Sequence, residues 1–292
     1  MANNLFQGTG VALITPFNPD GSVSYEQLAQ VLDFTGKHVD YWVVLGTTGE
    51  TATLTTAEKK QVLKFAKENN TYKRPIVFGI GGNNTHEVLE TIADTDFEGV
   101  SAILSVSPYY NKPSQEGIYQ HYIAIAEASP VPVILYNVPG RTMSNMTAAT
   151  TLRLAQHPNI IGIKEASGNL EQCMNIARNK PADFFLTSGD DMLAVPMMTF
   201  GGCGVISVLA NAYPRHFCQM VNAGLAGDYT KAGQMLLDYL DVNPLMYEES
   251  NPVGVKAAAA LQGVGSEMVR MPLLPATESL KARIKAGATP LL

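Results

Sequence analysis

Eight short apolar runs, rich in β-branched and aromatic residues, alternate with segments of helical periodicity along this chain of 292 residues. Each run has the length of a strand that is buried on both faces in a parallel sheet. Eight such strands alternating with helices predict an α/β fold, the (β/α)8 TIM barrel. The runs are VALITPF from Val11, YWVVLG from Tyr41, PIVFGI from Pro75, VSAILSVS from Val100, VPVILYN from Val131, IIGIKEA from Ile160, FFLTSGDD from Phe184 and GVISV from Gly204.

Two helix starts support this alternation. Thr55 with Glu58, and Asn84 with Glu87, have the spacing of capping boxes, in which two side chains satisfy free backbone N–H groups at the start of a helix. A doubly wound sheet is the alternative fold. However, no GxGxxG motif follows the first apolar run, and GIGGNN at 79–84 matches that motif poorly.

The pattern changes after Gly227, beyond which only helical segments follow. We therefore predict two domains: a barrel over residues 1–227 that carries the active site, and a small C-terminal helical domain over residues 228–292. The helices expected in the second domain lie at roughly 229–247, 252–263 and 276–287.

Composition excludes several classes of function. Hydrophobic residues make up 46% of the chain and charged residues 16%, as in ordinary globular proteins, and the net charge of −6 offers no basic surface to nucleic acid. No apolar run approaches the roughly 18 residues of a membrane-spanning helix. The first ten residues lack the basic and apolar regions of a secretion signal. We therefore expect a cytoplasmic protein without nucleic-acid or membrane partners.

The cysteines and histidines are too few and too scattered for a disulfide framework or a metal site. The five histidines show no HxH or HExxH spacing, so no metal centre is expected. Cys173, Cys203 and Cys218 are expected to be buried free thiols.

In a (β/α)8 barrel the catalytic groups lie where the strands end, because the loops that follow the strands form the active site. Glycines, hydroxyls and ionisable groups gather at these ends in this sequence. A glycine pair at 201–202 precedes the last strand instead, and is expected to form a tight turn rather than a phosphate site. The strand ends read GTTGE (46–50), SPYYN (107–111), YNVPGRT (136–142), KEASGN (164–169) and SGDD (188–191).

Lys164 is the one cation within the buried run IIGIKEA. In the structural interpretation its side chain reaches solvent and pairs with Glu165. Adjacent residues on a strand point to opposite faces, however, which disfavours that pair. A lysine that points into an apolar barrel loses part of the solvation that favours its charged form, and its neutral amine can attack a ketone. The iminium that results is an electron sink, and this Schiff-base chemistry needs no cofactor.

Three further groups fit such chemistry. Tyr136 ends the strand before that of Lys164, so its phenol can carry protons close to the amine. GTTGE supplies successive backbone N–H groups and two hydroxyls for an anion, and Arg141 offers a planar fork for a carboxylate. Taken alone, a tyrosine in a core or a loop such as GTTGE is more often structural.

The five strand-end motifs, in this order, resemble the dihydrodipicolinate synthase family of pyruvate-dependent class I aldolases, and the resemblance covers essentially the whole chain. The resemblance implies that pyruvate condenses with L-aspartate 4-semialdehyde to give 4-hydroxy-tetrahydrodipicolinate, a precursor of diaminopimelate and lysine. It implies a Schiff base on Lys164 and a proton relay of Tyr136, Thr47 and Tyr110. It also implies a homotetramer made of two tight dimers, in which each Tyr110 serves the neighbouring subunit.

The resemblance also implies binding roles. Thr48, with Thr47, would hold the carboxylate of pyruvate, Gly189 and Ile206 would line the site with backbone groups, and Arg141 would bind the carboxylate of the semialdehyde.

A regulatory lysine site is implied at the dimer interface. Lysine-sensitive relatives carry histidines where this chain has Thr56 and Lys59. Because Lys59 carries a like charge and accepts no hydrogen bond, we expect weak or absent inhibition by lysine. The other residues implied for this site are Ala52, Asn83, Glu87 and Tyr109.

Two other functions remain open at this stage. The first is another pyruvate aldolase of the same group, acting on N-acetylneuraminate or a keto-sugar acid, although a cationic Arg141 suits a charged aldehyde better than a polyol. The second is a catalytically silent barrel that senses keto acids, against which the presence of Lys164, Tyr136, Thr47 and Tyr110 argues.

Overall fold

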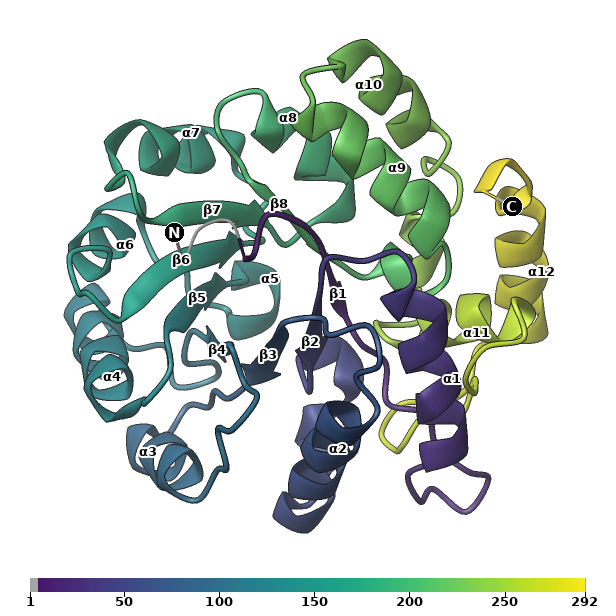
Figure 1. Cartoon of the computed structure of the whole chain (residues 1–292), viewed down its shortest axis with the longest axis horizontal. Coiled ribbons are helices and arrows are strands. Elements are labelled where there is room, and N and C mark those ends of the chain that lie inside the picture. Colours follow the sequence, from purple (N-terminus) through teal and green to yellow (C-terminus); the bar gives the residue numbers. More distant parts are fainter. Residues whose placement is uncertain (1–4, 292) are drawn as a thin grey trace.

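The computed structural model describes residues 5–291, and within them the strands form one closed barrel (Figure 1). All neighbouring strands are parallel and follow one another in chain order, and the barrel closes where Gly8 of the first strand pairs with Gly204 of the last. The predicted (β/α)8 barrel is therefore confirmed. Its strands are β1 (Gly8–Ala12), β2 (Tyr41–Val44), β3 (Ile76–Gly79), β4 (Ala102–Val106), β5 (Val133–Asn137), β6 (Ile160–Glu165), β7 (Phe185–Ser188) and β8 (Gly204–Ser207).

Alternation along the strands builds two separate apolar layers. Val43, Ile134 and Ile206 belong to a cluster that fills the inside of the barrel. Trp42 and Leu135, which neighbour them in sequence, belong to a larger cluster between the strands and the surrounding helices. Both layers are buried, which explains why the strands read as continuous apolar runs.

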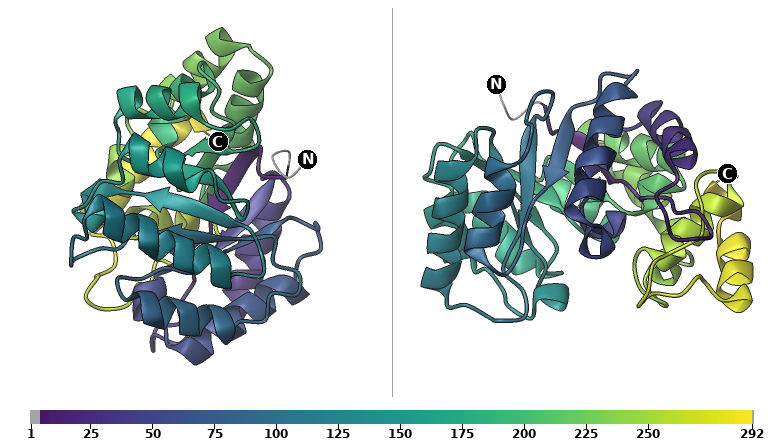
Figure 2. Two further views of the ribbon diagram at one scale, coloured as in Figure 1. Left: turned by 90° about the vertical axis from the view of Figure 1, so that its left-hand side faces the viewer. Right: turned by 90° about the horizontal axis from the view of Figure 1, so that it is seen from below.

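Helices surround the barrel, except for the short α5, which follows β5 directly (Figures 1 and 2). The helices of the barrel are α1 (Tyr25–Gly36), α2 (Thr56–Glu68), α3 (Thr85–Ala93), α4 (Gln115–Ala128), α5 (Pro139–Thr142), α6 (Ala148–Leu154), α7 (Leu170–Asn179), α8 (Ala194–Met198) and α9 (Pro214–Leu225). Three more follow: α10 (Tyr229–Leu237), α11 (Val253–Leu261) and α12 (Glu278–Gly287).

The first strand begins three residues earlier than predicted, at Gly8 rather than Val11. The added residues GTG contain two glycines, which are required by close contacts with Asp40 and Tyr41. A Cβ atom at Gly10 would lie 2.2 Å from the ring of Tyr41, and one at Gly8 would lie 2.1 Å from the carboxylate of Asp40. The glycines therefore make room for β2 instead of ending a strand.

The two predicted helix caps differ in detail. Thr55 and Glu58 form the full capping box at the start of α2. At α3 the side chain of Asn84 accepts a hydrogen bond from the N–H of His86, but Glu87 accepts from the side-chain amide of Asn84 at 2.9 Å rather than from its backbone. The prediction of a second capping box is therefore wrong, because the side-chain amide of asparagine can itself donate a hydrogen bond to the glutamate.

The helix predicted over 229–247 is shorter in the structure, because α10 ends at Leu237. Its hydrogen bonds tighten to an i−3 pattern at Tyr239, and Pro244 has no N–H to continue the helix. Helix α10 packs against α8 and α9, whereas α11 packs against α12. Figure 2 shows α11 and α12 (yellow) beside α1. The division of the chain at residue 227 stays a prediction.

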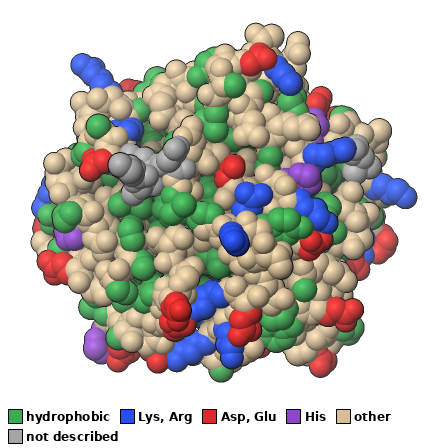
Figure 3. Space-filling model, in the orientation of Figure 1, with side chains coloured by type: hydrophobic (Ala, Val, Ile, Leu, Met, Phe, Trp, Pro, Cys, Tyr) green, Lys and Arg blue, Asp and Glu red, His purple; other side chains and the backbone are tan. Residues whose placement is uncertain are grey.

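Charges of both signs are mixed on the face drawn in Figure 3. At its lower edge, over α2 and α3, basic side chains interleave with acidic ones. Lys60 on α2 pairs with Asp94, which follows α3, at 2.5 Å. Across residues 5–291, none of the helices combines the length and apolar character that crossing a membrane would require.

Candidate active site

Lys164 lies near the carboxyl end of β6 with its side chain inside the barrel. It pairs in register with Tyr136 on β5 and with Thr187 on β7. Lys164 is 5% exposed and Tyr136 is 7% exposed, and the lysine Nζ lies 4.4 Å from the centre of the tyrosine ring. The barrel therefore brings an amine and a phenol together in a place that is almost closed to water.

Glu165 turns away from Lys164, as the alternation of the strand requires. Its carboxylate accepts hydrogen bonds from Asn137 at 3.1 Å, from the N–H of Ser167 at 2.8 Å and from Gln172 at 2.9 Å. Among the described side chains, Lys164 has no acidic partner within 4 Å. The structural interpretation, in which Lys164 pairs with Glu165, is therefore wrong.

Gly189 follows β7 and packs directly against the lysine. A Cβ atom there would lie 2.9 Å from Cε of Lys164 and 2.6 Å from Cβ of Ala166, so only glycine leaves the lysine its present position. The N–H of Gly189 donates to the carbonyl of Glu165 at 2.7 Å. Ile206 is fully buried on β8, inside the barrel.

The GTTGE loop follows β2 and is bounded by two residues in the left-handed region, Leu45 (φ 59°) and Glu50 (φ 55°). Between them lies a single 3-10 turn, Thr47–Gly49. Thr47 and Thr48 are the first residues of that turn, and their backbone N–H groups have no hydrogen-bond partner within residues 5–291. Two N–H groups of this kind, together with the half-buried Thr47 hydroxyl, are suited to an anion.

Two residues predicted for the active site, Tyr110 and Arg141, do not lie within the site of their own chain. Tyr110 is 87% exposed, in the left-handed region at φ 70°, and Arg141 is exposed on α5. An exposed aromatic ring in a constrained conformation is typical of a contact with another molecule.

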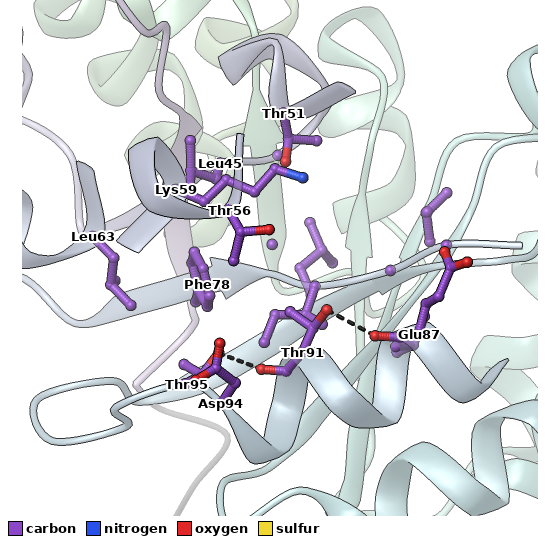
Figure 4. A pocket seen from close by; sticks show the side chains of 18 of the residues that line it. Leu45, Thr51, Thr56, Lys59, Leu63, Phe78, Glu87, Thr91, Asp94 and Thr95 are labelled. Atoms are coloured by element: carbon purple, nitrogen blue, oxygen red, sulfur yellow. Dashed lines mark hydrogen bonds between the residues drawn. The ribbon is translucent and has the colours of Figure 1, made fainter. Parts of the chain in front are cut away.

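Five of the six residues predicted for regulation line a cavity of about 820 Å³ between α2 and α3 (Figure 4). Thr56, Lys59, Asn83, Glu87 and Tyr109 line it, and the cavity continues to Thr47 and Tyr136. Ala52 is exposed and lies outside the lining.

Lys59 differs from its neighbours on α2. Lys60, Lys64 and Lys67 each pair with an acidic side chain, whereas Lys59 has no such partner within the described part of the chain. Figure 4 shows its side chain extended along the cavity toward Thr51. Partial burial lowers the pKa of the Lys59 ammonium.

Two sets of residues near the site were given no role in the sequence analysis. Asp191 accepts hydrogen bonds from the N–H groups of Val208 (3.1 Å) and Leu209 (2.8 Å) and so joins the ends of β7 and β8, and burial raises its pKa to about 6. Asn251 donates to the hydroxyl of Thr48 at 3.1 Å. Lys256 is buried against the same loop, and the same signal that identified Lys164, a lysine inside an apolar run, was present there in VGVKAAAAL.

Within residues 5–291, no group of three or more histidine, cysteine, aspartate or glutamate side chains could hold a metal ion. Cys173 and Cys218 are buried and Cys203 is partly buried, and all three are free thiols.

Fold and site together define a (β/α)8-barrel enzyme with a phenol and a buried lysine, unpaired within the described part of the chain, at the carboxyl end of the strands. The chain matches the model of the dihydrodipicolinate synthetase family over residues 5–289, and it belongs to that family.

Relatives of known name and structure agree with this placement. The 4-hydroxy-tetrahydrodipicolinate synthase of Cytophaga hutchinsonii is 51% identical over 281 residues, which cover 96% of this chain and 95% of that protein. Dihydrodipicolinate synthase from Cyanidioschyzon merolae, solved with lysine bound, superposes with a TM-score of 0.93 at 38% identity, covering 99% of both chains. A monomeric dihydrodipicolinate synthase variant superposes with a TM-score of 0.95 at 32% identity, covering 99% of both chains.

Proposed function

We propose that this chain is a Schiff-base-forming lyase that condenses pyruvate with L-aspartate 4-semialdehyde to give 4-hydroxy-tetrahydrodipicolinate, in the biosynthesis of diaminopimelate and lysine. Family membership and the named relatives support the reaction. The single observation that carries the mechanism is the side chain of Lys164, which is buried, lies against the ring of Tyr136 and has no acidic partner among residues 5–291.

The reaction begins at the lysine amine. Neutral Nζ of Lys164 adds to the keto carbon of pyruvate, and the adduct loses water to give an iminium. Loss of a methyl proton turns the iminium into an enamine, whose carbon attacks the aldehyde of the semialdehyde. The amino group of the semialdehyde then adds to the iminium carbon, which closes the ring and releases Lys164.

Tyr136 carries protons to and from these intermediates, in a relay with Thr47 and with Tyr110 of a second subunit. The N–H groups and hydroxyls of Thr47 and Thr48 hold the carboxylate of pyruvate, and Gly189 and Ile206 line the site. Arg141 binds the carboxylate of the semialdehyde. No added cofactor is required, because the iminium itself withdraws the electrons.

The chain is proposed to work in the cytoplasm as a homotetramer of two tight dimers. The exposure of Tyr110 supports a dimer in which this side chain crosses to the neighbouring site. The monomeric variant among the solved structures makes the oligomeric state a matter for measurement, by sedimentation velocity.

Borohydride reduction in the presence of pyruvate, followed by peptide mass mapping, tests the mechanism. We expect one pyruvyl adduct per chain, on Lys164. An adduct on another lysine, or none, would contradict the proposal. Steady-state assays with aspartate semialdehyde and with N-acetylmannosamine then separate the proposed reaction from that of a sugar-acid aldolase.

A further inference from the structure

Lys256 is the most deeply buried cation among the described residues, and it does not face the reaction. It lies on α11 with a side chain that is 0% exposed and forms an ion pair with the carboxylate of Glu50, which is 3% exposed. Its ammonium also donates to the carbonyl of Met268 at 2.8 Å and lies 4.1 Å from the centre of the Phe17 ring. Burial lowers the pKa of Lys256 to about 8, and the charge of Glu50 opposes that change.

Arg270 binds the same carboxylate from another direction. Its backbone N–H donates to Oε2 of Glu50 at 3.0 Å, and its guanidinium donates to the carbonyls of Gly21 and Thr53, both at 2.8 Å. The guanidinium also pairs with Glu58 and lowers the pKa of that carboxyl to about 2. The stretch 50–58 is therefore held at both ends by one arginine.

These contacts converge on the last residue of the GTTGE loop. Glu50 is in the left-handed region, which is unfavourable for a residue with a Cβ atom and persists only where the surroundings impose it. The N–H of Glu50 donates to the carbonyl of Thr47, so the conformation of Glu50 and the orientation of the turn are linked. Asn251 adds a third contact from the same part of the chain, to Thr48.

We propose that Lys256 and Arg270 are positioning residues for substrate: through Glu50 they hold the GTTGE turn so that the N–H groups of Thr47 and Thr48 face the carboxylate of the keto acid. Neither residue touches substrate. The inference rests on the proposed function, since it concerns the carboxylate of pyruvate. A purely structural ion pair would affect only the stability of the fold. A positioning role predicts that loss of the Lys256–Glu50 pair also weakens the binding of pyruvate.

The test compares Lys256→Met with Lys281→Met. Lys256→Met removes the charge and keeps an unbranched side chain of similar length. Lys281 is a matched control, since it also forms ion pairs, with Glu267 (2.7 Å) and Glu278 (3.0 Å), but these do not contact residues 45–50. For each protein, the fraction of Lys164 trapped by borohydride is measured by intact mass as a function of pyruvate concentration.

We expect the half-saturating concentration of pyruvate to rise at least tenfold in Lys256→Met, while the maximal fraction of adduct stays at the wild-type value. In turnover, KM for pyruvate should rise likewise and kcat should change less than threefold. Lys281→Met should match the wild type in both assays. A folded Lys256→Met protein with wild-type half-saturation would overturn the inference.

Should Lys256→Met fail to fold, Glu50→Gln decides the question in the same way. It removes the charge but keeps an acceptor for the N–H of Arg270. We expect its half-saturating pyruvate concentration to rise as well, and a wild-type value would overturn the inference. If the wild-type protein itself gives no adduct on Lys164, the proposed function fails and the inference with it, an outcome distinct from a variant that simply behaves like the wild type.

Discussion

Lys164 is confined on two sides by neighbours of different kinds. The ring of Tyr136 covers its ammonium, and the missing side chain of Gly189 makes space for its methylenes. Tyr136 lies on β5 and Gly189 directly follows β7, so the two strands next to β6 set the position of the amine. Because the lysine adds little packing of its own, its removal should leave the barrel intact.

Lys164→Ala should therefore fold and lose nearly all turnover, since no other residue can form the iminium. Lys164→Arg should fail as well, because a guanidinium stays protonated. Circular dichroism and a turnover assay check both variants. A few per cent of wild-type turnover in either one would mean that Lys164 is structural.

Tyr136→Phe tests the phenol without removing the ring that covers the ammonium. We expect kcat to fall by roughly 10²–10⁴, the usual effect of losing a general acid–base. The borohydride adduct on Lys164 should still form at saturating pyruvate, given enough time. Unchanged kcat would remove Tyr136 from the mechanism.

At the scale of elements, the contact between α3 and α4 contains a buried histidine. His121 on α4 is 4% exposed; its Nδ1 lies 2.9 Å from the hydroxyl of Thr85, and its Nε2 has no partner within residues 5–291. Burial lowers the pKa of His121 to about 4. The unfolded chain therefore binds the proton first, so this contribution to stability is present above pH 6.5 and is lost as the pH falls toward 4.

Full titration of His121 corresponds to about 3 kcal/mol of unfolding free energy. We expect His121→Leu to lose less stability than the wild type between pH 7 and pH 5, as measured by urea unfolding at each pH. His86→Leu, which removes a histidine that is 80% exposed on α3, is the control and should keep the wild-type slope. Equal slopes for all three proteins would refute the assignment.

The cavity between α2 and α3 carries the prediction about regulation. Lys59 lines it without an acidic partner among the described residues, so a bound lysine would meet a like charge. That charge costs about 1 kcal/mol at 4 Å in water and more when partly buried. We expect half-inhibition by lysine to lie above about 0.1 mM, which corresponds to roughly −5.5 kcal/mol of binding.

Lys59→His should restore inhibition, because a neutral imidazole can accept a hydrogen bond from the ammonium of the ligand. Lys60→His is the matched control, since Lys60 is the next residue on α2 and pairs with Asp94. Dose–response curves at saturating pyruvate decide the matter. A half-inhibiting concentration below about 0.1 mM in the wild type would show the prediction wrong.

Local sequence patterns predicted the strands well. They failed where contacts with residues distant in the sequence determine which residue is required. The start of β1 was missed because the reason for its glycine at position 10, the ring of Tyr41, lies on another strand. The end of α10 was missed because the hydrogen bonds change to an i−3 pattern at Tyr239, before Pro244 is reached. Lys164 could be identified from its neighbours in the sequence. The partner of Lys256, by contrast, lies far away in the sequence, in the GTTGE loop.

At the scale of the whole molecule, Tyr110 predicts a shared site. Tyr110→Phe should lower kcat if its phenol acts in the neighbouring subunit, since 87% of the residue is exposed on its own chain. Inactive Tyr110→Phe and Lys164→Ala chains, refolded together, should regain up to roughly a quarter of wild-type activity, because one site of each mixed dimer keeps both groups. Native mass spectrometry confirms that mixed dimers form; if they form and activity does not return, the site is not shared.

The contacts of Lys256 and Arg270 with Glu50 also have a consequence for the synthesis of the protein. The hydrogen bond between Glu50 and Arg270 joins positions 220 residues apart, and a ribosome adding 5–20 residues per second needs about 10 to 40 s to cover that interval. The GTTGE loop therefore emerges long before the residues that hold it exist. On the proposed role of those residues, a nascent barrel can enclose Lys164 and still bind a keto acid only weakly until residues 256–270 have been translated.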